Sequence, residues 1–142
     1  MAGEHGRAVR VLGILLGLAI PLSVVHYIDN YTAYEVYPKA SAVGIEVTQG
    51  LVGISWFVFT FFGLLGYWLY RRGQIVAGSL CLAFYSTTGL ISIGHYSVPG
   101  MSELAWWRHV SIWIDITLGA AVLLFALWST MPSHLRELRR AG

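Results

Sequence analysis

Charged residues are scarce in this 142-residue chain. Only 11% of its residues are Asp, Glu, Lys or Arg, whereas 56% are hydrophobic. Soluble domains carry about a quarter charged residues, so the composition does not fit an ordinary water-soluble fold. The hydrophobic content also excludes a disordered chain. We therefore expect a membrane protein, organised as a single domain over residues 1–142.

Cysteine is almost absent as well. Cys81 is the only cysteine of the sequence, so neither an intramolecular disulfide nor a cysteine-based zinc site can form. The sequence also contains no G-x-S-x-G nucleophile elbow, no Walker A loop and no dinucleotide-binding fingerprint. Its few cations are clustered rather than spread over a surface. These absences argue against nucleotide chemistry and against nucleic-acid binding.

The sequence does contain four long apolar segments, at residues 9–28, 48–70, 74–96 and 107–130. Each has close to the ~20 residues that a helix needs to cross ~30 Å of hydrocarbon. The first segment follows two arginines, as in a signal peptide, but no small-x-small cleavage site precedes His26, so we expect a retained helix. The sequence thus predicts an all-α integral membrane protein, an antiparallel bundle of four transmembrane helices embedded in the lipid bilayer.

The distribution of cations predicts the orientation of this bundle. Seven of the nine Lys and Arg residues flank the predicted helices at one end: Arg7, Arg10, Arg71, Arg72, Arg136, Arg139 and Arg140. Cations next to transmembrane helices are retained on the cytoplasmic side during insertion. We therefore expect a multi-pass protein of the cell membrane with both termini cytoplasmic, and a short basic tail at residues 131–142.

Three histidines fall at the opposite, outer end of the predicted bundle. His26 ends the first apolar segment, His95 ends the third, and His109 begins the fourth. Because neighbouring helices alternate in direction, these distant positions share one layer. Neutral imidazoles are good ligands for zinc-like divalent metals, so His26, His95 and His109 are candidate ligands of a metal with an open coordination position. As an alternative, His95 together with His26 or with His109 could supply the two axial ligands of a haem.

Carboxylates lie in the same outer region. We consider Asp29, Glu46 and Asp115 candidates for acid–base catalysis or for orienting the histidines. Asp115 lies deepest, where an unpaired charge costs about 2.5–3.5 kcal/mol. We therefore expect its side chain to face the interior of the bundle, against a polar group from the first or third helix.

Two classes of function remain open from the sequence. The first is a small membrane enzyme, or a metal- or haem-binding protein, whose outward-facing His/Asp site acts on a lipidic or redox substrate. The second is a non-enzymatic membrane subunit, in which the polar layer locks the helices together or docks a membrane-protein partner or a second copy of the chain. No sequence feature identifies a substrate.

Overall fold

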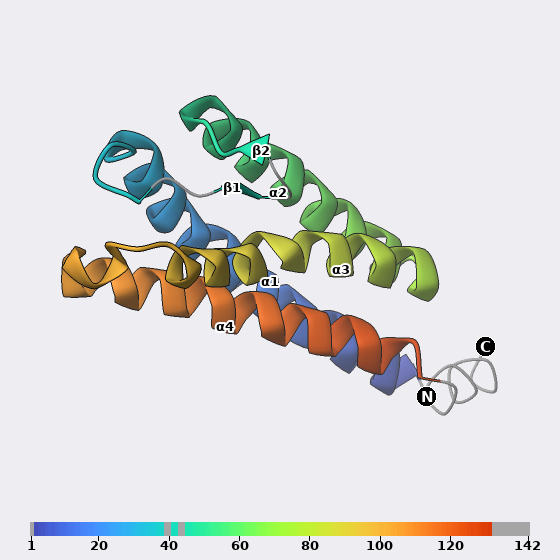
Figure 1. The fold of residues 1–142 in the computed structure, drawn as a ribbon. Coiled ribbons are helices and arrows are strands. Elements are labelled where there is room, and N and C mark those ends of the chain that lie inside the picture. Colours follow the sequence, from blue (N-terminus) through green and yellow to red (C-terminus); the bar gives the residue numbers. More distant parts are fainter. Residues whose placement is uncertain (1, 39–40, 43–44, 132–142) are drawn as a thin grey trace.

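The computed structural model describes residues 2–38, 41–42 and 45–131. Within these residues, four long helices form an up-and-down bundle (Figure 1): α1 (Ala2–Thr32), α2 (Gln49–Arg71), α3 (Ile75–Ile91) and α4 (Trp106–Ser129). Each helix packs against the two that neighbour it around the bundle. The helices alternate in direction, so the start of α1, the turn between α2 and α3, and the end of α4 lie at the same end.

Short elements lie in the connections. Strands β1 (Ser41–Ala42) and β2 (Ile45–Glu46) pair antiparallel between α1 and α2, with Ser41 opposite Glu46. The 3₁₀ helices η1 (Ser92–Ser97) and η2 (Met101–Glu103) connect α3 to α4. The longer connections are therefore both at the end opposite the N-terminus.

The prediction of four apolar helices is confirmed for the described residues. The segments Gly3–Thr32, Gln49–Arg71, Ile75–Ser97 and Trp106–Ser129 are each long and apolar enough to cross a membrane. Helix α1 differs from the prediction at both ends, and the third segment differs as well. Helix α1 begins several residues before position 9 and continues to Thr32 instead of ending at residue 28. The prediction followed the apolar residues, and the helix extends beyond them into polar residues. The third segment changes from α-helix to 3₁₀-helix at Ser92.

The turn between α2 and α3 fixes these two helices side by side. Gly73 has φ of +80°, a left-handed conformation that favours glycine, and its N–H donates to the carbonyl of Tyr70 at 2.9 Å. The N–H of Gln74 donates to the carbonyl of Leu69 at 3.0 Å. These bonds satisfy the last carbonyls of α2, so the chain reverses direction at once and α3 packs directly on α2.

Helices α3 and α4 cross with their backbones in contact. A Cβ atom on Gly119 would lie 2.9 Å from the carbonyl oxygen of Ser86 and 3.1 Å from Cα of Gly89, and one on Gly89 would clash with the carbonyl oxygen of Asp115. Small residues permit this close approach in membrane bundles. The crossing places Asp115 directly against α3.

Buried apolar side chains form two clusters. One contains residues of all four helices, including Leu12, Tyr70, Leu82 and Val122. The other lies at the end with the long connections and joins Tyr37, Met101, Leu104, Ile112 and Ile116. Along the chain, the buried polar residues Ser23 and His26 of α1 lie between Ala19 of the first cluster and Tyr37 of the second. On α4, the buried Asp115 lies between Ile112 and Ile116 of the second cluster.

The α3–α4 crossing yields a stability prediction. Gly89→Ala should lower the free energy of unfolding by about 1–3 kcal/mol, because the added methyl group meets backbone atoms of α4 that cannot move aside. Thermal unfolding of the detergent-solubilised protein measures this. Gly17→Ala is the matched control, since its Cβ would have no neighbour within 4 Å. Equal unfolding temperatures for the two variants would contradict the close crossing.

Candidate functional site

His26 and His95 lie against each other at the end of the bundle with the long connections. Helix α1 positions the first and η1, which continues α3, positions the second. Their ring centroids are 5.9 Å apart and the rings are nearly perpendicular, at 82°. His26 is buried, with 2% of its surface exposed. This pair is the part of the predicted site that the structure brings together.

The imidazole pair has unused hydrogen-bonding capacity. Nδ1 of His26 and Nδ1 of His95 are both buried and have no hydrogen-bond partner in the described part of the chain. Buried polar side-chain atoms are nearly always hydrogen-bonded, since leaving one without a partner costs about 1–3 kcal/mol. Two such atoms on adjacent rings therefore mark a position where a ligand could supply the missing partners.

Polar and aromatic side chains surround the pair. The Asn30 amide nitrogen lies 3.4 Å from Nε2 of His95, and the Tyr37 ring lies 5.4 Å from the His95 ring. The Tyr27 ring packs edge-on against His26, and its hydroxyl is 2.7 Å from Oγ1 of Thr88. When the Asn30 amide donates, Nε2 of His95 is the acceptor, and the His95 proton is then on Nδ1.

Asp29 forms an ion pair rather than contacting the histidines. Nε and Nη2 of Arg108 donate to its two carboxylate oxygens at 2.9 and 3.1 Å, and the Tyr37 hydroxyl donates to Oδ2 at 2.6 Å. The pKa of Tyr37 is raised mainly by burial and further by the hydrogen bond to Asp29. Its hydroxyl therefore stays protonated and remains a donor. The cluster joins the end of α1, the following loop and the start of α4.

Asp115 is buried and accepts a hydrogen bond from Ser92 at 3.2 Å. Ser92 lies where α3 changes to η1, so the prediction that Asp115 faces a polar group of the first or third helical segment is confirmed. The side chain of Glu46, another candidate, lies outside the described part of the structure.

His109 does not join the other two histidines, and the three-histidine metal site is not supported. Its Nδ1 lies 3.1 Å from the Tyr96 hydroxyl, and the two rings stack. The reason is helical phase: Arg108 and Asp115 are seven residues apart and share the inward face, whereas His109 is turned about 100° from Arg108. Among the described residues, no group of three His, Cys, Asp or Glu side chains is placed to hold a metal ion. The haem alternative stays a prediction.

Sequence reasoning missed the contributions of two aromatic residues. Tyr37 covers His95 and binds Asp29, but it follows Asp29 by eight residues in a loop, so helical spacing gave no signal. Trp56 of α2 donates from Nε1 to the Ser23 hydroxyl at 3.1 Å. Tyr and Trp are generally enriched at membrane–water interfaces, so their presence in a sequence does not indicate such specific contacts.

No family model, curated protein or solved structure matches this chain. The function is therefore inferred from the chemistry of the site itself.

The ion pair yields a second prediction. Asp29→Asn and Arg108→Gln should each destabilise the protein, and the double variant should lose less than the sum of the two, because each single change leaves a half-buried partner without its counter-charge. A double-mutant cycle of unfolding free energies should give a coupling of about 1–3 kcal/mol. Additive losses would show that the pair contributes no stability.

Proposed function

We propose that the chain is a multi-pass membrane protein whose arginine-rich end faces the cytoplasm. Arg7 and Arg10 of α1 and the Arg71–Arg72 pair at the end of α2 all lie at this end. They support the orientation, because cations beside transmembrane helices are retained on the cytoplasmic side. The His26–His95 pair then lies near the outer surface of the cell membrane.

We further propose that His26 and His95 form a membrane-embedded acid–base site that binds the polar end of a lipidic substrate. The observation that carries this proposal is the presence of two adjacent imidazoles whose buried Nδ1 atoms have no partner among the described residues. A hydroxyl or carbonyl group of a ligand would supply those partners. A hydrophobic tail would match the apolar bundle around the site.

Imidazole suits this role because each neutral ring carries one donor nitrogen and one acceptor nitrogen. The unprotonated nitrogen of one ring can therefore accept a proton from a substrate hydroxyl, while the N–H of the other ring donates a hydrogen bond to the substrate oxygen. Asp29 acts in this proposal as a positioning residue: it holds the hydroxyl of Tyr37, whose ring covers His95. Asp115 keeps α3 and α4 in register below the histidines through Ser92.

A second candidate function is a non-enzymatic membrane subunit. The cluster of Asp29, Arg108 and Tyr37 favours it, because these groups bond to one another and fix the outer connections without needing a ligand. In that case the rigid outer surface would bind a membrane-protein partner or a second copy of the chain.

The orientation is tested by cysteine labelling in a Cys81→Ala background. Cysteines placed at Ser97 and Gln74 lie at opposite ends of the helical segment formed by α3 and η1. We expect an impermeant maleimide to label Ser97→Cys in intact cells, and Gln74→Cys only after the membrane is opened. The reverse pattern would overturn the orientation.

The acid–base site is tested by lipid profiling of cells that express the wild type, His26→Gln, His95→Gln or His109→Gln. We expect the wild type to shift the abundance of at least one lipid species relative to empty-vector cells. His26→Gln and His95→Gln should abolish the shift, while His109→Gln, which changes a histidine outside the pair, should preserve it.

Two outcomes would contradict the acid–base proposal. One is a lipid shift that persists in both His26→Gln and His95→Gln when all variants reach the membrane in equal amounts. The other is a wild-type profile identical to that of empty-vector cells, together with a co-purifying membrane protein that is lost in Arg108→Gln. The latter result would favour the subunit function.

A further inference from the structure

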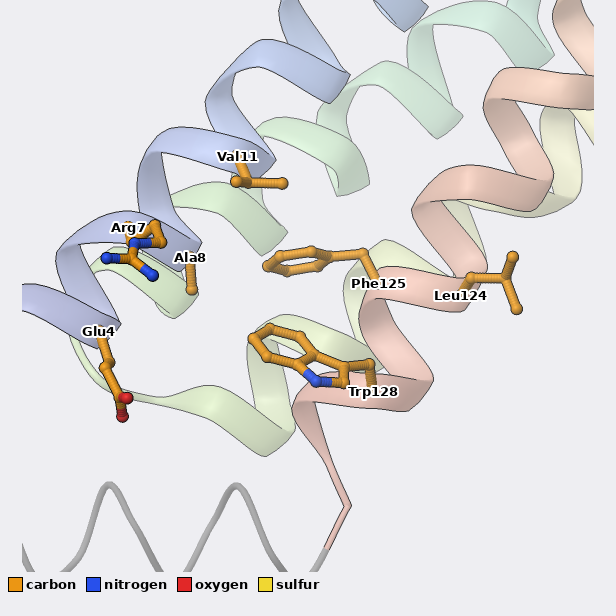
Figure 2. A pocket seen from close by; sticks show the side chains of 7 residues that line it. All are labelled: Glu4, Arg7, Ala8, Val11, Leu124, Phe125 and Trp128. Carbon is orange, nitrogen blue, oxygen red and sulfur yellow. The ribbon is translucent and has the colours of Figure 1, made fainter.

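A groove lies at the other end of the bundle, between the start of α1 and the end of α4 (Figure 2). It has a volume of about 460 Å³ and is lined by Glu4, Arg7, Ala8, Val11, Leu124, Phe125 and Trp128. The volume falls within the range of small-molecule sites, about 300–1,000 Å³. The groove is separate from the histidine pair, so it needs an explanation of its own.

Two side chains that line the groove, Phe125 and Trp128, belong to a series of packed rings. His5 of α1 stacks on Tyr70 at 5.6 Å, Tyr70 contacts Phe125 at 5.3 Å, and Phe125 contacts Trp128 at 5.6 Å. The rings of Phe125 and Trp128 point toward α1 (Figure 2). These contacts join α1, α2 and α4, so the groove is part of the folded bundle and not a gap between independent helices.

The polar groups at the mouth carry both signs of charge. Arg7 and Glu4 are exposed, and neither forms an ion pair within the described part of the chain. The floor beyond them is apolar: Val11 lies four residues further along α1, about 6 Å deeper at 1.5 Å per residue. The groove thus runs from the level of charged headgroups toward the hydrocarbon of a membrane.

We propose that this groove binds one phospholipid whose headgroup carries both a phosphate and a primary ammonium, as in phosphatidylethanolamine. Arg7 would bind the phosphate and Glu4 the ammonium, while an acyl chain packs on Val11, Leu124 and Phe125. The apolar floor favours a membrane lipid over a free phosphate. The carboxylate of Glu4 disfavours a purely anionic headgroup, which it would repel.

The test is native mass spectrometry of the full chain, released from nanodiscs containing equal amounts of phosphatidylethanolamine, phosphatidylglycerol and phosphatidylcholine. We expect the wild type to retain one phosphatidylethanolamine molecule, about three- to five-fold more often than either other lipid. A preference of this size is what one partly exposed ion pair, here between Glu4 and the ammonium group, contributes to binding. Arg7→Gln should reduce retention of both phosphatidylethanolamine and phosphatidylglycerol, whereas Glu4→Gln should shift the preference to phosphatidylglycerol.

Arg10→Gln is the matched control, because Arg10 is an exposed arginine of the same helix that does not line the groove. It should retain phosphatidylethanolamine like the wild type. Equal retention of the three lipids by the wild type, or no retained lipid, would overturn the proposal. So would a wild-type preference for phosphatidylglycerol, which would identify a site for anionic lipids, or equal losses in Arg7→Gln and Arg10→Gln.

Discussion

Buried polar groups in this bundle must find partners among other polar groups of the protein, because the apolar side chains around them cannot supply hydrogen bonds. Most do so locally. The hydroxyls of Ser23, Ser86 and Ser129 donate to carbonyls three or four residues earlier in their own helices. Longer-range bonds, such as that from Ser92 to Asp115, then connect the helices. Among the described residues, the buried side-chain atoms without a partner are the hydroxyls of Tyr70 and Ser79 and the Nδ1 atoms of His26 and His95, and only the two nitrogens belong to adjacent rings that a single ligand could bridge.

The close contact between α3 and α4 determines where the hydrogen bond between Ser92 and Asp115 can form. Gly89 and Gly119 allow the two backbones to touch, and the touching point is the carbonyl of Asp115 itself. The Asp115 carboxylate is therefore held within reach of the Ser92 hydroxyl, one turn beyond Gly89 on the same helical segment. The crossing of α3 and α4 thus accounts both for the glycine contacts and for the hydrogen bond between Ser92 and Asp115.

Sequence reasoning predicted the features that depend on hydrophobicity and chain direction. Four long apolar runs identify four helices, and alternating directions bring His26 near His95 although they are distant in sequence. It could not predict which way a side chain turns when several faces of a helix carry polar residues, so nothing in the sequence indicated that His109 contacts Tyr96. Tyr37 could not be found either, because the loop that carries it has no periodicity to interpret.

The ion pair between Asp29 and Arg108 also bears on the order in which the bundle can be assembled. The two residues are 79 positions apart, one at the end of the first helix and the other at the start of the last. During synthesis Asp29 is made long before its counter-ion and is left without it until Arg108 has been added. The ion pair can therefore form only late, once α4 is in place, and a chain interrupted before α4 would leave the Asp29 carboxylate without its counter-charge.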